Sequence, residues 1–365
     1  MRILVYGISN QKGGISEFMM SLNKNLSEKN ICFDYIIKGK NSVYESQINE
    51  MNGKVLYYNY KNKFERVSNL YKIMKDERKK TNVFYYNTSG TFFVFPIFFA
   101  KLLGYKIISH AHCGRSNNLN FVYVFLNFIN RIFLNLVSSS KLSCSDVAHD
   151  WVYGKSKNVI QVNNAIDSKK FFYSDKRRNE IRKKMNLSEK DFVLINVGRV
   201  EYPKNQKFLI ELMKKLNNHD DNFKLFFVGD GSDFTDLDLY TKKNNVKNVK
   251  FLGQRNDIND LLNASDLFLL PSFYEGFPIV CVEAQATGLT CILSDYITKT
   301  ANITGNVKFL SLDKSDEWVN FIFNYAKNYQ INKRKDMNVE LKKCGFDEQS
   351  ISKIVYSQIL KICKE

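Results

Sequence analysis

Short apolar runs alternate with longer amphipathic stretches along the whole chain, and this alternation restricts the possible fold more than any other feature. The runs have the length of buried strands, and the stretches between them have the apolar spacing of helices. The expected strands cover 2–7, 31–37, 54–58, 83–87, 105–110, 140–144 and 158–163, then 191–197, 223–228, 248–252, 266–270, 290–294 and 307–310. The expected helices cover 15–29, 64–80, 91–103, 119–137, 205–217, 233–244, 257–263 and 278–287, and the chain from Asp316 onward. Such alternation predicts parallel sheets covered on both faces.

The pattern begins twice, which predicts two doubly wound α/β domains. Ile3–Gly7 and Val193–Gly198 are each an apolar run that ends in glycine and precedes a loop and a helix. We expect an N-terminal domain over 1–168, a C-terminal domain over 169–345, and a last helix over 346–365 that packs back toward the first domain. The charged stretch Asp167–Lys190 is expected to join the two domains. Because ligands bind at the carboxyl ends of parallel strands, two facing domains predict a site in the cleft between them.

Composition excludes several classes of protein. Of the 365 residues, 44% are hydrophobic and 25% are charged, which excludes a disordered or collagen-like chain. The chain has seven cysteines, an odd number, and none of them forms a CxxC motif, which favours reduced thiols over a disulfide framework. The longest apolar stretch, Thr91–Gly104, is interrupted by Pro96 and Lys101 and is shorter than the ~20 residues of a spanning helix. We therefore expect a cytoplasmic protein, at most peripheral on the inner face of the plasma membrane.

The chain is basic, with 54 Lys and Arg against 37 Asp and Glu and a formal net charge of +17. Residues 118–137 are strongly apolar and aromatic and carry one charge, at Arg131. This segment is either a crossover helix buried between layers or a surface that enters an anionic leaflet. The basic residues are spread along the chain and no recognised nucleic-acid motif is present, so we expect no nucleic-acid partner.

The strongest candidate site is the segment LLPSFYEGFPIVCVEA, residues 269–284. An apolar strand ends, a loop carries Glu275, and Pro278 is suited to the first position of a helix. The amides at such a helix start favour an anion such as a diphosphate. The residues expected around that anion are Gly276, Phe277, Pro278 and Ile279. Glu275 and Glu283 would then face one ligand, although acidic residues at a helix start also simply stabilise the helix dipole.

A second basic element, GRVEYPKN, follows the expected strand 191–197 and contains Arg199 and Lys204. An arginine can bind two phosphate oxygens at once and a lysine acts as a point charge, so together they suit a leaving diphosphate. A solvated basic loop in a basic protein explains the same residues equally well.

Two elements of the first domain also follow expected strands. The Gly13-Gly14 turn would allow a ligand to approach the backbone at a helix start, but it is weak evidence and is not a GxGxxG motif. His110 ends the strand 105–110 and is placed to hydrogen-bond a sugar hydroxyl or a phosphate oxygen. A metal site made of His110, His112 and Cys113 lacks a fourth ligand at zinc-like spacing, so we expect no metal.

Taken together, these motifs resemble the retaining, metal-independent glycosyltransferases of the GT-B fold, family GT4, above all bacterial enzymes of capsule, exopolysaccharide or O-antigen synthesis. The resemblance covers nearly the whole chain, and its most specific element is E-x7-E, from Glu275 to Glu283. Further segments that match are Gly198-Arg199 with Lys204-Asn205 at the diphosphate, Val228–Gly231 beside the donor, Phe251–Ile258 at the base, and Asn163–Asp167 between the domains, where Ala165 replaces the family's glycine. Gly13-Gly14 and His110 fit the acceptor-side loop and the active-site histidine.

The resemblance implies a GT-B fold, two facing doubly wound domains with a cleft between them. It also implies transfer of a hexose or N-acetylhexosamine from a nucleotide-diphosphate sugar, with UDP favoured, to a polyisoprenyl-diphosphate-linked saccharide, with retention and without a metal or cofactor. His110 and Glu275 are the implied catalytic residues. The implied donor-binding residues are Gly14, Arg199, Lys204, Gly231, Arg255, Gly276, Phe277, Pro278, Ile279 and Glu283.

Two other functions remain compatible with the same motifs. A sugar-nucleotide epimerase with this architecture would use the same donor but would release an altered sugar nucleotide without an acceptor. A nucleotide-sugar-binding protein that has lost catalysis would bind the donor without turnover, although the intact set of charged residues argues against such a loss.

Overall fold

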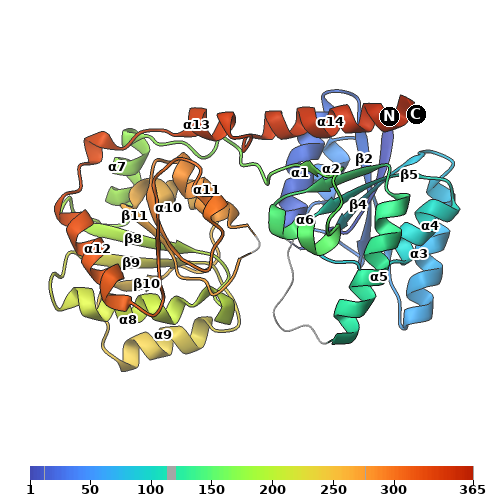
Figure 1. The fold of residues 1–365 in the computed structure, drawn as a ribbon. Helices are drawn as coiled ribbons and strands as arrows, with labels where there is room; N and C mark the ends of the chain where they lie inside the picture. Colours follow the sequence, from blue (N-terminus) through green and yellow to red (C-terminus); the bar gives the residue numbers. More distant parts are fainter. Residues whose placement is uncertain (12, 113–120, 276, 365) are drawn as a thin grey trace. The chain divides into compact units, whose positions relative to one another are not determined.

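The computed structural model describes residues 1–11, 13–112, 121–275 and 277–364, and it divides the chain into two α/β units (Figure 1). The first unit contains Met1–Ala165 and Glu348–Glu365, and the second contains Ile166–Asp347. Each unit has a parallel sheet with helices on both faces. The predicted fold class, two doubly wound α/β domains, is therefore confirmed.

The sheet of the first unit has seven described strands in the order β3-β2-β1-β4-β5-β6-β7. These strands are β1 (Arg2–Tyr6), β2 (Cys32–Lys38), β3 (Lys54–Tyr58), β4 (Val83–Thr88), β5 (Lys106–Ala111), β6 (Ser140–Ser143) and β7 (Ile160–Gln161). The strand order reverses between β1 and β4, which pair in parallel with Tyr6 opposite Tyr86. This reversal is the switch point at which ligands bind in such sheets.

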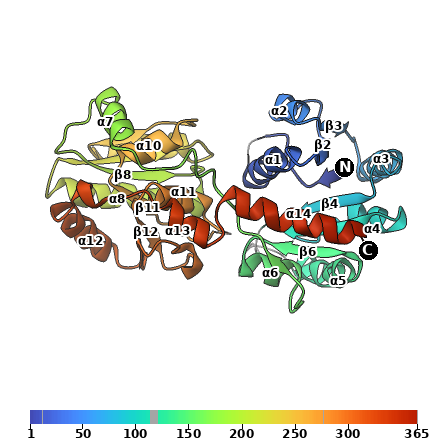
Figure 2. The same ribbon diagram turned by 90° about the horizontal axis from the view of Figure 1, so that it is seen from above.

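Helices cover both faces of this sheet. They are α1 (Gly14–Ser27), α2 (Glu45–Glu50), α3 (Lys63–Glu77), α4 (Phe95–Leu102), α5 (Phe121–Val137), α6 (Asp146–Val152) and α14 (Glu348–Lys364). The last helix lies beside α1 (Figure 2), and its Ile351, Val355, Ile359 and Ile362 are buried in the core that α1 shares with the sheet. The end of the chain is therefore part of the first unit.

The sheet of the second unit has six described strands in the order β10-β9-β8-β11-β12-β13. They are β8 (Phe192–Val197), β9 (Phe223–Val228), β10 (Val249–Phe251), β11 (Leu267–Leu270), β12 (Thr290–Ser294) and β13 (Val307–Leu310). The helices are α7 (Asp175–Lys184), α8 (Gln206–Asn217), α9 (Phe234–Lys243), α10 (Ile258–Ala264), α11 (Ile279–Ala286), α12 (Ser315–Lys327) and α13 (Asn338–Lys343), with short 3-10 turns at Tyr202–Lys204, Lys299–Ala301 and Ile331–Lys333. The switch point of this sheet lies between β8 and β11.

The charged stretch 167–190 is not the linker that the sequence suggested. Its middle forms α7, which belongs to the second unit and buries two of its arginines. Arg178 donates to Asp266 at 2.5 Å, and Arg182 donates to the other oxygen of the same carboxylate at 3.2 Å. A distant acidic partner therefore draws a highly charged helix into the core.

The region after Asp316 also differs from the expected continuous helix. It forms α12, a 3-10 turn, α13 and α14, and the last two are separated at Gly345, whose φ is +74°. Glycine adopts this left-handed conformation without strain, so the helix can end there and the chain can turn toward the first unit's own core.

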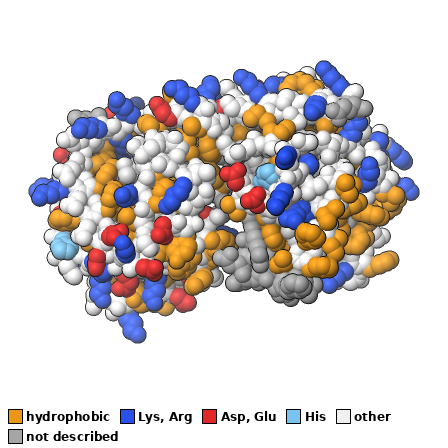
Figure 3. Space-filling model, viewed as in Figure 1, with side chains coloured by type: hydrophobic (Ala, Val, Ile, Leu, Met, Phe, Trp, Pro, Cys, Tyr) orange, Lys and Arg blue, Asp and Glu red, His pale blue; other side chains and the backbone are white. Residues whose placement is uncertain are grey.

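Helix α5 is only half buried, so the expectation of a helix buried between layers is wrong for one of its faces. Asn127 is buried and bonds to Thr91 and Trp151, but the opposite side of the helix is exposed. Together with α4 it forms a surface that we call the α4–α5 apolar face. Its exposed side chains are Phe95, Phe98, Leu102, Phe125, Leu126, Phe128, Ile129, Ile132 and Leu136. Figure 3 shows hydrophobic side chains gathered over this part of the unit.

None of the described helices is long and apolar enough to cross a bilayer.

Candidate functional site

Two of the sequence motifs meet at the switch point of the second sheet. Gly198–Lys204 follows β8, and Pro271–Glu275 follows β11, the neighbouring strand. Because both strands are parallel, both loops leave the same edge of the sheet. The structure therefore brings together two segments that the sequence only suggested separately.

Backbone and side-chain contacts fasten the two loops to each other. The amide of Phe273 donates to the carbonyl of Pro203 at 2.9 Å, and Asn205 Nδ2 donates to the carbonyl of Pro271 at 3.2 Å. The rings of Tyr202 and Phe273 lie 5.2 Å apart. Asn205 has a φ of +53°, a left-handed conformation that asparagine tolerates well. The loops are thus held in one arrangement before any ligand binds.

The centre of this arrangement is an ion pair between Lys204 and Glu275. Lys204 Nζ lies 2.6 Å from Glu275 Oε1, and Ser272 Oγ donates to the same oxygen at 2.7 Å. The side chains of Lys204 and Glu275 are 19% and 10% exposed. Both of these contacts, made by described residues, reach Glu275 at Oε1. Ser272 was not singled out from the sequence, although it lies inside the same motif three residues before Glu275.

The two other predicted cations are not part of this pair. The Arg199 side chain is 78% exposed and pairs with Glu201 at 3.0 Å. Arg255 follows β10 and pairs with Asp257 at 2.6 Å, and this pairing raises the pKa of Arg255. Both side chains are charged and solvent-accessible, so both can reorient toward an anion at this edge of the sheet.

Gly231 allows the loop after β9 to approach the loop after β8. A Cβ atom at Gly231 would lie 2.2 Å from the carbonyl oxygen of Val200, which is closer than any side chain can approach. The amide of Val200 donates to Asp230 at 3.0 Å, and the amide of Asp233 donates to Val200 at 3.1 Å. The close contact of the two backbones therefore requires glycine at position 231.

The start of α11 is arranged differently from the sequence prediction. Pro278 is the residue before the helix and Ile279 is its first residue, whereas we expected Pro278 at the first position. The amide of Ile279 already donates to Phe277 and that of Cys281 to Pro278, at 3.0 and 2.9 Å. These amides are therefore less available to a diphosphate than expected. Gly276, the remaining predicted residue of this loop, lies outside the described residues.

Two further predicted residues flank this helix start. The Phe277 ring stacks on Phe346, with ring centroids 5.5 Å apart and planes 15° apart, so it fixes the loop to the second unit's own core. Glu283 lies in the second turn of α11 and is partly exposed. The E-x7-E spacing thus places one carboxylate in the loop and one on the helix that follows it.

His110 does not meet the surface as the sequence suggested. It is fully buried on β5, and its Nδ1 lies 2.8 Å from the hydroxyl of Tyr85. Burial, with a smaller contribution from His112, lowers the pKa of His110 well below its usual value. Because strand residues two apart share a face, His112 points the same way one step nearer the carboxyl end. His110 Nε2 is buried and has no hydrogen-bond partner among the described residues.

His112 is the histidine that follows β5 directly. Its Nε2 lies 2.7 Å from Asn87 Oδ1, and its ring centroid is 4.0 Å from that of His110. Burial lowers the pKa of His112 to about 3, so its imidazole is neutral near neutral pH. Gly14, the exposed first residue of α1, belongs to the same unit. Cys113, the third residue of the metal arrangement considered above, lies outside the described residues.

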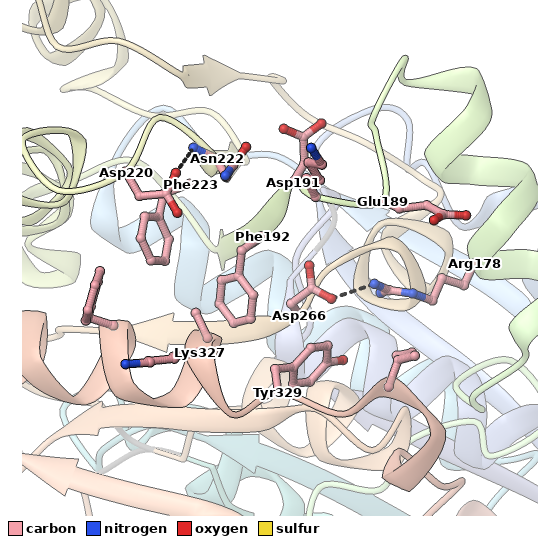
Figure 4. A pocket seen from close by; sticks show the side chains of 14 residues that line it. Arg178, Glu189, Asp191, Phe192, Asp220, Asn222, Phe223, Asp266, Lys327 and Tyr329 are labelled. Atoms are coloured by element: carbon pink, nitrogen blue, oxygen red, sulfur yellow. Dashed lines mark hydrogen bonds and ion pairs between the residues drawn. The ribbon is translucent and has the colours of Figure 1, made fainter.

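A cavity of about 430 Å³ opens at the opposite, amino-terminal edge of the second sheet (Figure 4). Two of its carboxylates are already bound by the protein. Asp266 binds Arg178, and Asp191 accepts from the amide of Ser188 and pairs with Lys224 at 3.4 Å. The aromatic rings of Phe192 and Tyr329 pack edge to face. This cavity therefore has the character of a structural gap beside an ion-pair cluster.

Two doubly wound units, each with a parallel sheet, are the architecture of the GT-B fold. Residues 177–337 match the family model described as glycosyl transferases group 1. The domain match and the relatives below support a glycosyltransferase enzyme that resembles the GT4 type.

Known relatives and structures agree with this class. The putative glycosyltransferase EpsF of Bacillus subtilis is 26% identical over 93% of this chain and 91% of its own length. The UDP-Gal:alpha-D-GlcNAc-diphosphoundecaprenol alpha-1,3-galactosyltransferase of Escherichia coli is 30% identical over 65% of this chain and 61% of its own length. The crystal structure of Anabaena Alr3699/HepE in complex with UDP has a TM-score of 0.82 at 17% identity and covers 99% of this chain and 100% of that one.

Proposed function

We propose that this glycosyltransferase moves a hexose or an N-acetylhexosamine from a UDP-sugar to a lipid-linked saccharide in surface polysaccharide synthesis, with retention and without a metal. The observation that carries the proposal is the Lys204–Glu275 pair at the switch point of the second sheet. It joins a cation suited to a diphosphate with a carboxylate suited to sugar hydroxyls. The lipid-linked acceptor and the UDP donor are supported by the names of the relatives above.

In this proposal each residue has a separate task. Lys204 and Arg199 bind the diphosphate and stabilise the charge that grows on it as the glycosidic bond breaks. Glu275 keeps its bonds to Lys204 and Ser272 through Oε1 and accepts a sugar hydroxyl through Oε2. Glu283 binds the ribose hydroxyls. We place His112, rather than His110, near the reacting groups, because it is the histidine closer to the carboxyl end of β5.

Retention follows in this proposal from attack on the face that the diphosphate leaves. The acceptor hydroxyl oxygen bonds to the anomeric carbon while the bond to the phosphate oxygen breaks. The departing phosphate oxygen takes the hydroxyl proton, so no protein carboxylate is required as a nucleophile. The cations near the diphosphate supply the stabilisation that a metal gives in other enzymes.

Nucleotide binding in a chelator tests the donor part of this proposal. We expect UDP and UDP-sugars to raise the melting temperature in EDTA, because a ligand at ~100 times its dissociation constant stabilises the folded state by ~2.7 kcal/mol. GDP and CDP serve as matched nucleotides. A shift that EDTA abolishes would contradict metal independence, and a shift with GDP alone would contradict the choice of base.

We also propose that the α4–α5 apolar face docks on an anionic membrane at the inner face, where a lipid-linked acceptor resides. Soluble monomers rarely expose a continuous apolar surface of this kind. On α5 the exposed residues Phe125, Phe128, Ile129, Ile132 and Leu136 form one helical stripe. The net charge of +17 favours anionic lipid over a neutral partner.

Vesicle flotation tests this membrane contact. The double variant Phe128→Asp/Leu136→Asp should bind phosphatidylglycerol vesicles at least about tenfold more weakly, because two apolar side chains no longer enter the lipid. Leu239→Asp/Val339→Asp is the matched control, since these side chains of the second unit are 58% and 61% exposed. If both double variants lost vesicle binding equally, or neither lost it, the proposed docking of the α4–α5 apolar face would be contradicted.

A further inference from the structure

The carboxyl edge of the first sheet carries a group of aromatic and basic side chains that the roles above do not use. Tyr6 ends β1 at the switch point, Lys38 ends β2, and Tyr58 ends β3. Arg66, in the first turns of α3, and Phe93, in the loop before α4, lie against them. We call these five residues, with Tyr60, the tyrosine–arginine cluster. It lies on the α3–α4 side of the sheet, whereas His110 and His112 face Phe18 of α1.

The cations of this cluster rest on aromatic rings. The guanidinium carbon of Arg66 lies 3.5 Å from the centre of the Phe93 ring and 5.5 Å from that of Tyr60. Lys38 Nζ lies 4.7 Å above the same Tyr60 ring. An arginine that stacks on a ring keeps its N–H donors in the plane of the guanidinium, where they can bind an oxyanion.

The hydrogen-bond donors of the cluster exceed its acceptors. Arg66 Nε is buried and has no hydrogen-bond partner, although another part of the guanidinium interacts with the hydroxyl of Tyr6. The hydroxyls of Tyr6 and Tyr58 lie 3.4 Å apart, so one donates to the other and one proton remains for a third group. Among the residues that the structure describes, no carboxylate forms an ion pair with Arg66 or Lys38. A buried donor without an acceptor is destabilising, and an anion would satisfy it.

We propose that the tyrosine–arginine cluster binds an oxyanion of the acceptor, a phosphate or a carboxylate attached to its saccharide. The cluster has two cations, free hydroxyl and guanidinium donors, and a place at the switch-point edge where ligands of such sheets bind. This inference rests on the proposed transferase function, because it assigns the anion to the acceptor. Two sources have this chemistry, the diphosphate of a lipid-linked sugar and the carboxylate of an acidic sugar.

Calorimetric titration of the full chain distinguishes the sources. The probes are a short-chain prenyl-diphospho-N-acetylglucosamine, a glucuronic acid disaccharide, its neutral glucose counterpart, and inorganic phosphate. Arg66→Gln should weaken binding of the anionic probe at least about tenfold, because charge-assisted hydrogen bonds are lost. Lys38→Gln should also weaken binding of the anionic probe. Because Lys38 is exposed, this variant tests the inference even if Arg66→Gln folds poorly. Lys72→Gln removes a charge from an exposed position of α3 outside the cluster and should have no effect.

The outcomes separate this inference from the proposed function. If the variants lose affinity only for the diphosphate probe, the cluster binds the lipid linkage. If they lose affinity only for the glucuronide, the cluster binds an acidic sugar. The inference is overturned if the Arg66→Gln and Lys38→Gln variants both bind the anionic probes as tightly as the wild-type protein does. It is also overturned if the wild-type protein binds these probes no more tightly than it binds inorganic phosphate. UDP affinity should be the same in wild type and Arg66→Gln. Failure of the wild-type protein to bind UDP would instead count against the proposed donor.

Discussion

Glu275→Gln should lower the rate of sugar transfer by about 10²- to 10³-fold, a loss typical of removing one electrostatic contact to a transition state. Glutamine has nearly the same shape but no charge, so Lys204, 2.6 Å away, loses its counterion and the sugar loses a charged acceptor. UDP affinity should change little, since the carboxylate does not bind the phosphates in our account. The measurement is kcat at saturating donor together with the UDP dissociation constant.

A matched control and a double variant sharpen this expectation. Asp238→Asn removes a carboxylate that pairs with Lys242 on the surface of α9 and should leave kcat unchanged.

Lys204→Met alone should weaken UDP binding by about tenfold or more, because a charge-assisted bond to the diphosphate is lost. The double variant Lys204→Met/Glu275→Gln should lose less kcat/KM than the two single losses multiplied, because both remove the same contact. The role assigned to Glu275 would be contradicted if the two substitutions had strictly independent effects on kcat/KM, or if Glu275→Gln kept the wild-type kcat.

Asp266→Ala should destabilise the second unit by about 3–5 kcal/mol, the cost expected when one partner of a buried ion pair is removed. Asp266 is the shared acceptor of Arg178 and Arg182, and it also accepts from the amide of Val193 at 2.8 Å. Removing it leaves two buried guanidiniums without a counterion. Arg334 donates to the carbonyls of Asn263 and Ser265, to which Arg178 also donates, so it adds further positive charge there.

Urea unfolding measures this loss, and the chain offers a convenient probe. Trp318 is fully buried in the second unit, so in a Trp151→Phe background its fluorescence reports that unit. Asp316→Ala is the control, because its pair with Lys215 is exposed and should contribute less than about 1 kcal/mol. A loss below about 1 kcal/mol for Asp266→Ala would show that other groups compensate the arginines.

The strands could be predicted closely because strands buried on both faces of a parallel sheet are nearly continuous apolar runs. Observed strands such as β3 (Lys54–Tyr58) and β12 (Thr290–Ser294) have the expected bounds. The local sequence pattern did not predict the structure where a residue distant in the sequence determines it. Helix α7 is so highly charged that it suggests a solvated linker, and only Asp266, 88 residues away from Arg178, explains its burial.

The candidate site shows the same limit. Lys204 and Glu275 could each be singled out from a motif, but their contact joins residues 71 positions apart and depends on the strand order. His110 and His112 lie two residues apart at the end of β5 and are both buried, and the sequence pattern indicated neither this burial nor the bond between His112 and Asn87. The tyrosine–arginine cluster collects residues from three strand ends, a helix and a loop, with no local motif that marks them.

The most direct test of the central claim is the product of a transfer reaction run in EDTA. Purified protein, a UDP-hexose and a short-chain prenyl-diphospho-N-acetylglucosamine should give a disaccharide whose new linkage has the donor's anomeric configuration, as measured by NMR. An inverted linkage would contradict the retaining mechanism, and activity only after a metal is added would contradict metal independence. An altered UDP-sugar released without the acceptor, or no product from any nucleotide sugar, would contradict the proposed transfer itself.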